Sequence, residues 1–209
     1  MNGLILANGE PPSRQLCRGR AAKAQWILCC DGACLYAKAY GLTPDMIVGD
    51  MDSIGEKLPE SFANIPLVKY PVEKDATDLQ LAIELTLKKG CTSIEIIGGT
   101  GRRTDHLLGN IQLLLYLAKK NIPATMIDSY NFISVVTGTV PLEGKEGDLV
   151  SIIPLSSNLR ITTENLKYSL KEHLMPADQP LGISNVLLQS PAAFHISGGY
   201  AVLVRPFKG

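Results

Sequence analysis

The decisive stretch of the sequence reads Met46-Ile47-Val48-Gly49-Asp50-Met51-Asp52-Ser53. Its first three residues form a short apolar run that is typical of a buried strand, and Gly49 ends this run. Asp50 and Asp52 follow one residue apart, a spacing that points both side chains to the same side of an extended backbone. Adjacent carboxylates repel each other unless a cation lies between them, and Mg²⁺ shared with substrate phosphates suits oxygen ligands. The alternative is a polar turn in which the two carboxylates cap backbone amides.

On both sides of this stretch, apolar runs alternate with helical patterns. The helix expected from Thr77 to Gly90 has a clear amphipathic period, and Thr77 with Gln80 forms a capping box. A later helix has an apolar face made of Leu107, Leu108, Ile111, Leu114, Leu115 and Ala118. Strands are expected at residues 4–7, 26–30, 46–48, 67–70, 93–97 and 124–127, and two shorter helices at 13–24 and 35–40. This alternation predicts an α/β domain over residues 1–128, with a mostly parallel, Rossmann-like sheet and flanking helices.

The pattern changes after residue 128. Short β-rich runs at 132–137, 149–154, 194–196 and 200–204 are separated by Gly, Pro and Asn, without a convincing amphipathic helix. Such a pattern predicts a small all-β sandwich domain over residues 129–209.

Composition excludes several classes of function. The 20 basic and 20 acidic residues cancel, which gives no reason to expect nucleic acid or an anionic membrane as a partner. No apolar run is long enough to span a bilayer, and the N-terminus lacks the basic segment of a secretory signal. The five scattered cysteines predict buried thiols at Cys29 and Cys30 and a reducing, cytoplasmic location.

Carboxylates and cations collect just after the predicted strands. The aspartates in such positions are Asp31, Asp50, Asp52, Asp75, Asp78 and Asp105, and the cations are Lys74, Arg102 and Arg103. Ligands of an open α/β sheet bind beyond the carboxyl ends of its strands, so this pattern predicts a site for Mg²⁺ and a polyphosphate. Asp78 and Asp105 fit equally well as first-turn residues that favour a helix dipole. His106 fits either a packing histidine or an acid–base group.

The loop Gly98-Gly99-Thr100-Gly101 offers backbone amides that could bind phosphate. It matches neither a Walker A loop nor a full Gly-x-Gly-x-x-Gly motif, and no Gly-Lys-Ser/Thr occurs in the chain. This argues against a P-loop kinase.

The combination of motifs resembles the thiamine pyrophosphokinase family. The resemblance rests on Asn8-Gly9-Glu10, Asp31-Gly32-Ala33 and residues 44–53, 74–78 and 98–106, in order and spacing, and continues weakly through 166–168, 182–185 and 197–199. It implies a homodimeric enzyme that uses Mg²⁺ and transfers the pyrophosphoryl group of ATP to thiamine. It also implies that residues 1–128 bind ATP and metal, and that residues 129–209 bind thiamine and form the dimer.

The resemblance further assigns roles to individual residues. The catalytic set is Asp31, Asp50, Asp52, Asp75 and Asp78, of which Asp31, Asp50, Asp52 and Asp75 hold metal. ATP and its phosphates are assigned to Asn8, Gly9, Lys74, Thr77, Gly99, Thr100, Arg102, Arg103, Asp105 and His106. Thiamine is assigned to Ser184 and Asn185.

Three positions depart from the family pattern. Val186 and Leu187 replace an acidic and an aromatic residue, and Ala33 replaces a glycine. The only tryptophan, Trp26, lies in a predicted core strand rather than in the β domain, where eukaryotic relatives stack thiamine. Two other functions remain open: an Asp-x-Asp nucleotide-sugar transferase, and a nucleotide-sensing module without turnover.

Overall fold

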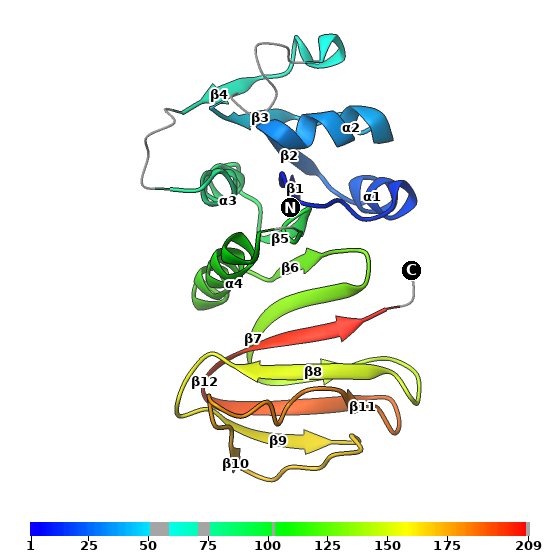
Figure 1. Cartoon of the computed structure of the whole chain (residues 1–209), viewed down its shortest axis with the longest axis vertical. Coiled ribbons are helices and arrows are strands. Elements are labelled where there is room, and N and C mark those ends of the chain that lie inside the picture. The colour runs from blue at the N-terminus through cyan, green and yellow to red at the C-terminus, as the bar shows by residue number, and fades with distance from the viewer. Residues whose placement is uncertain (51–58, 71–75, 102, 208–209) are drawn as a thin grey trace. The chain divides into compact units, whose positions relative to one another are not determined.

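The computed structural model of the chain describes residues 1–50, 59–70, 76–101 and 103–207. It divides into two compact units, Met1–Ser129 and Tyr130–Gly209. Figure 1 shows the long helices in the first unit and strands in the second.

The first unit is built on a parallel sheet. Its strands lie in the order β4-β3-β2-β1-β5-β6, and every pairing between them is parallel. The central strands carry consecutive buried residues, such as Leu4, Ile5 and Leu6, as expected for a sheet covered on both faces. The strands are β1 (Asn2–Leu6), β2 (Trp26–Cys30), β3 (Met46–Gly49), β4 (Leu67–Lys69), β5 (Ser93–Ile97) and β6 (Ala124–Ile127).

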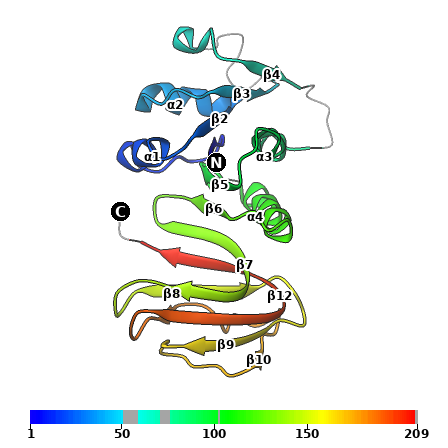
Figure 2. The same cartoon turned by 180° about the vertical axis from the view of Figure 1, so that it is seen from behind.

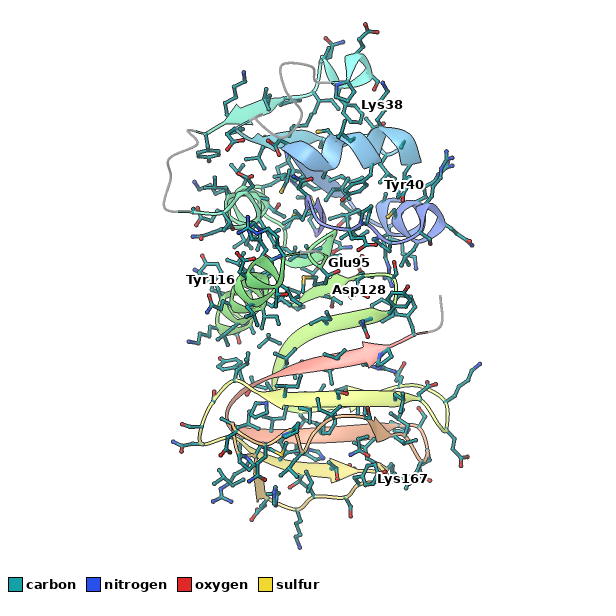
Figure 3. All side chains as sticks on the ribbon, viewed as in Figure 1. Lys38, Tyr40, Glu95, Tyr116, Asp128 and Lys167 are labelled. Carbon is teal, nitrogen blue, oxygen red and sulfur yellow. The ribbon has the colours of Figure 1, made fainter. Side chains whose placement is uncertain are left out.

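Helices cover both faces of this sheet. Both views place α1 and α2 on one side and α3 and α4 on the other (Figures 1 and 2). These helices are α1 (Arg14–Ala21), α2 (Cys34–Tyr40), α3 (Asp78–Lys88) and α4 (Thr104–Lys119), with short 3-10 turns η1 (Asp31–Ala33) and η2 (Glu60–Phe62). An ion pair of 3.1 Å joins Arg20 of α1 to Glu95 of β5, which is labelled in Figure 3. The prediction of an α/β fold with a mostly parallel sheet is confirmed.

The structure confirms the predicted start of α3 and corrects the predicted apolar face of α4. The hydroxyl of Thr77 accepts a hydrogen bond from the Gln80 N–H at 3.2 Å, which confirms the predicted N-cap of α3. The predicted apolar face of α4 was too wide, because Leu108 is 59% exposed whereas Leu114 and Leu117 are buried. Nine residues separate Leu108 from Leu117, about two and a half turns, so the two side chains lie on opposite sides of the helix.

The order of the strands reverses at β1. Strands β2, β3 and β4 extend the sheet on one side of β1, and β5 and β6 extend it on the other. The crevice beyond the carboxyl ends of the strands at such a reversal is where open α/β sheets bind ligands. The loops that follow β1 and β5 therefore border the expected site.

The second unit is organised around its last strand, β12 (Ala192–Pro206). This strand pairs with β7 (Asn131–Leu142) on one side, while β9 (Arg160–Glu164) and β8 (Leu149–Pro154) pair with its first and second halves on the other. The register shifts between Ile196 and Ala201, so the two runs predicted at 194–196 and 200–204 form one irregular strand. Short strands β10 (His173–Leu174) and β11 (Asn185–Val186) complete the unit.

The core of this unit comes from both halves of β12. Phe194 and Ala201 are fully buried, together with Ile161 of β9 and Val150 of β8. The described residues of the unit contain no helix, in agreement with the predicted all-β domain. None of the helices in the described ranges is long and apolar enough to cross a membrane.

Candidate active site

Two backbone loops meet at the reversal point of the sheet. The Gly9 N–H donates to the Gly98 carbonyl at 2.8 Å, and the Glu10 N–H donates to the Thr100 carbonyl at 2.9 Å. The loops approach so closely that a Cβ atom at Gly9 would overlap the carbonyl oxygens of Gly98 and Thr100. The motifs that follow β1 and β5 thus form one continuous backbone surface.

Asp31 lies at the carboxyl end of β2 and is only 1% exposed. One of its carboxylate oxygens, Oδ1, accepts a hydrogen bond from the Gly32 N–H. The side chain of Asn8 packs against Gly32 so closely that a Cβ there would overlap it. A Cβ at Gly49 would lie 2.6 Å from the Cβ of Asp31. The ends of β1, β2 and β3 therefore converge around Asp31, and Asp50 follows directly after Gly49.

The predicted metal ligands are only partly described. Asp31 and the half-buried Asp50 are in the structure, whereas Asp52 and Asp75 lie outside the described residues. Within the described ranges, no three His, Cys, Asp or Glu side chains form a group that could hold a metal. Aspartate carboxylates where the ends of several strands converge nevertheless fit Mg²⁺. This ion takes oxygen ligands from one or two carboxylates and completes its coordination shell with phosphate and water.

The remaining predicted phosphate contacts lie at helix starts. Thr77 caps α3 and Asp78 begins it, while Arg103, Asp105 and the exposed His106 surround the start of α4. Lys74 and Arg102 lie outside the described residues.

Arg103 holds Asp105 through two hydrogen bonds, Nε to Oδ1 at 3.2 Å and Nη2 to Oδ2 at 2.6 Å. This pairing lowers the pKa of Asp105 to about 2. Both side chains are about two-thirds exposed, at 68% and 65%. An exposed pair of this kind is weak, so a phosphate group can compete for the guanidinium.

Two uncharged side chains hold the joined loops from outside. The Tyr36 hydroxyl donates to the Ala7 carbonyl at 3.2 Å, and burial raises the pKa of Tyr36, so the hydroxyl keeps its proton. The Asn110 side-chain amide of α4 donates to the Gly99 carbonyl at 2.7 Å. Sequence reasoning missed both residues because it searched for charged groups. The available signal was the polar Asn110 between Leu108 and Ile111 of the apolar face of α4.

Buried thiols lie on both sides of Asp31 in the sequence. Cys29 and Cys30 are buried, as expected, and the Sγ atoms of Cys29 and Cys34 lie 3.6 Å apart. Burial raises the pKa of the Cys29 thiol, which therefore stays protonated near neutral pH.

In the second unit, Asn185 is 7% exposed and its side chain is fully engaged. Its Oδ1 accepts from the N–H groups of Tyr168 at 3.0 Å and Val186 at 2.8 Å, and its Nδ2 donates to the Tyr168 carbonyl at 2.9 Å. Ser184 is exposed and has a left-handed backbone with φ 58°. Asn185 therefore fixes the position of Tyr168, and Ser184 leaves its hydroxyl accessible.

The surface near these residues is hollowed. A hollow of about 370 Å³ is bordered by Gly182 and Ile183, immediately before Ser184, and by Ile152, Ile153 and Pro154 of β8. Tyr168 is 58% exposed. Its neighbour Lys167, labelled in Figure 3, has its Nζ atom 5.7 Å from the Tyr168 ring centroid.

Trp26 begins β2, at the opposite end of that strand from Asp31, and its ring contacts Lys89.

Comparisons with known proteins agree for both units. Residues 18–126 match the family model for the thiamin pyrophosphokinase catalytic domain, and residues 138–201 match the model for the thiamin pyrophosphokinase vitamin B1 binding domain. A thiamine pyrophosphokinase of Bacillus subtilis is 37% identical over 170 residues, which are 79% of each chain. Thiamin pyrophosphokinase 1 of Caenorhabditis elegans is 27% identical over 89% of this chain and 82% of its own.

Solved structures of the same family superpose on nearly the whole chain. The crystal structure of thiamine pyrophosphokinase from Bacillus subtilis superposes with a TM-score of 0.89, at 29% identity over 100% of both chains. That from Geobacillus thermodenitrificans superposes with a TM-score of 0.83, at 27% identity over 99% of this chain and 98% of its own.

The α/β unit with carboxylates at its strand ends and the β unit that follows it, taken with these matches, place the chain among ATP-dependent transferases of the kinase class. The chain belongs to the thiamine pyrophosphokinase family, whose members transfer pyrophosphate from ATP to thiamine. Neither the nucleotide-sugar transferase nor the sensing module is supported by any of these matches.

Proposed function

We propose that this chain converts thiamine and Mg-ATP to thiamine diphosphate and AMP, and that its described site residues carry out this reaction. The observation that carries the proposal is the convergence of the buried Asp31 with Asn8 and the end of β3, beside the joined loops at the reversal point. The thiamine hydroxyl forms a bond to the β-phosphorus of ATP. The bond from that phosphorus to the α,β-bridging oxygen breaks, AMP leaves, and the hydroxyl proton passes to a base.

Each group of residues has a defined task in this reaction. Asp31, Asp50, Asp52 and Asp75 would hold Mg²⁺, which supplies charge neutralisation at the phosphates. Thr77, Asp78 and the backbone at Gly9, Gly99 and Thr100 orient the nucleotide. Arg103, released from Asp105, faces phosphate oxygens together with Lys74 and Arg102, beside His106. Positioning and electrostatic complementarity account for catalysis without a covalent intermediate.

The test is incubation of the protein with Mg-ATP and thiamine, followed by chromatographic identification of every product. Stoichiometric AMP and thiamine diphosphate are expected. Thiamine monophosphate with ADP, or no turnover at all, would refute the proposed function.

We propose that thiamine binds beside Ser184 and Tyr168. The support is the accessible Ser184 hydroxyl, the exposed Tyr168 ring that Asn185 holds in place, and the neighbouring hollow. Tyr168 then offers an aromatic face in a unit that contains no tryptophan. Asn185 acts through Tyr168, because all of its described hydrogen bonds are made to backbone groups.

Replacing Asn185 by Ala should raise the KM for thiamine roughly fivefold to a hundredfold, because unpaired buried groups typically cost about 1–3 kcal/mol. The KM for ATP should change little, and Ser184→Ala should act in the same direction with a smaller effect. Steady-state kinetics with each substrate varied in turn measures the split. Glu146→Gln, an exposed change in the same unit and outside this hollow, serves as control. Equal increases in both KM values would assign Asn185 a purely structural role.

We also propose that the enzyme is a symmetric homodimer, the commonest closed arrangement of soluble oligomers. The support is the resemblance, which implies a thiamine site shared between subunits. Light scattering at assay concentrations should give twice the 22.6 kDa mass of the chain. A fully active monomer would contradict this assembly.

A further inference from the structure

Three consecutive carbonyl groups of the loop after β5 each accept a hydrogen bond from outside the loop. The Gly98 and Thr100 carbonyls accept from the N–H groups of Gly9 and Glu10, at 2.8 and 2.9 Å. The Gly99 carbonyl between them accepts from the Asn110 side chain at 2.7 Å. Asn110 therefore ties the middle of this loop to α4.

A trans peptide unit is planar, so its C=O and the following N–H point in opposite directions. The bond from Asn110 to the Gly99 carbonyl therefore also fixes the direction of the Thr100 N–H, away from the Asn110 amide. Within the part of the chain that the structure describes, no group accepts a hydrogen bond from the N–H of Gly99, Thr100 or Gly101. Thr100 is half-buried and Gly101 is exposed, so a ligand can reach this backbone.

The rest of the loop leaves little freedom for another orientation. Gly98 has a left-handed backbone with φ 71°, and a Cβ there would overlap the Ala7 carbonyl oxygen. A Cβ at Gly99 would lie 3.0 Å from Cγ of the buried Met126 on β6. The loop therefore packs closely against Ala7 after β1 and Met126 of β6, and the Asn110 bond holds the Gly99 carbonyl within this packing.

We propose that Asn110 is a positioning residue for the reaction: it holds the Gly99 carbonyl so that the Thr100 N–H is presented to a phosphate group of ATP. A backbone N–H at this place binds an anion without adding a charged side chain. The inference rests on the proposed function, because it takes the loop after β5 as the phosphate-binding loop. It adds a residue whose side chain acts through the backbone.

The test uses Asn110→Ala and Asn110→Leu in the full chain. Leucine keeps the approximate shape of asparagine and removes the donor, so a shared effect of both variants reports the hydrogen bond rather than a cavity. Gln112→Leu is the matched control, an exposed amide on the same helix. KM values for ATP and thiamine, kcat, the Kd of Mg-ATP measured by calorimetry without thiamine, and the thermal midpoint are determined for each protein.

Both Asn110 variants should raise the KM for ATP and the Kd of Mg-ATP by about threefold to tenfold, the range expected for one lost neutral hydrogen bond. The KM for thiamine should stay unchanged, and the control should match the wild type in every measurement. A lowered thermal midpoint with an unchanged KM for ATP would overturn the proposal, because it would reduce Asn110 to a packing contact. Equal increases in both KM values would also overturn it.

Different results would contradict the proposed function and the proposed role of Asn110. If the unsubstituted protein formed no AMP and thiamine diphosphate, the proposed function itself would be wrong. If it turned over normally while both Asn110 variants bound Mg-ATP as tightly as the wild type, only the role of Asn110 would be wrong.

Discussion

Asp50→Asn and Asp31→Asn should each lower kcat/KM by about 100-fold or more, the effect of losing ~2.7 kcal/mol or more of electrostatic stabilisation at a reacting centre. The substitution keeps the volume of the side chain and removes a hard anionic ligand. In Asp31→Asn the remaining amide oxygen can still accept the hydrogen bond from Gly32, so the turn after β2 is preserved. The same loss is expected for Asp52→Asn.

A titration with Mg²⁺ separates a lost metal ligand from a damaged fold. The variants should need more Mg²⁺ for half-maximal activity, while their circular dichroism stays native. Asp45→Asn is the matched control, since Asp45 immediately precedes the other end of β3, where its Oδ2 accepts from the Ile27 N–H at 2.7 Å. Near-native turnover of Asp50→Asn at saturating Mg²⁺ would remove Asp50 from the metal site.

The sequence was sufficient to predict the framework of the site, because apolar runs and helix caps are local signals. The run from Met46 to Val48 belongs to strand β3, and Thr77 caps α3 as expected. Once the strands are known to be parallel, the position of Asp31 and Asp50 at one edge follows from topology. The position of these two carboxylates could therefore be predicted from the sequence, while their role at a metal site stays a prediction.

Tertiary contacts were not predictable in the same way. The bond from Asn110 to Gly99 depends on how α4 packs beside the loop after β5, and no local pattern encodes that distance. The engagement of Asn185 with Tyr168 joins residues 17 apart across two loops. Leu108 satisfied the apolar pattern of α4 but is exposed, because the buried face of this helix is narrower than the pattern.

The short strands of the second unit were missed for a related reason. Strand β9 (Arg160–Glu164) begins and ends with a charged residue, and of its five residues only Ile161 is buried. The strand is formed by its antiparallel pairing with β12, which the sequence of β9 alone does not indicate. Ile161, Thr162 and Thr163 favour a strand, but a run of three between charged residues is too short to predict one without its neighbour.

An ATP analogue with a non-hydrolysable bridge between the α- and β-phosphates should abolish transfer to thiamine, whereas a β,γ-bridged analogue should still react. An ordinary kinase aligns its acceptor with the γ-phosphoryl group and releases ADP; P-loop enzymes hold ATP with a Walker A loop, and protein kinases hold it with a Gly-rich loop and a separate lysine. This chain has neither motif; instead, Asp31 and Asp50 follow neighbouring strands and the loop after β5 presents backbone.

If the attacked atom is the β-phosphorus, the only bond that must break is the one from the α,β-bridging oxygen to that phosphorus. Blocking this bond removes the leaving group, so no product above background is expected even when binding is intact. Calorimetry should show that the α,β-bridged analogue binds, which separates loss of chemistry from loss of affinity. Chromatography of the β,γ-bridged reaction should yield AMP and an analogue of thiamine diphosphate in which the non-hydrolysable bridge joins the two phosphorus atoms. Transfer from the α,β-bridged analogue with release of a bridged ADP would mean that the γ-phosphorus is attacked and that the enzyme works as an ordinary kinase.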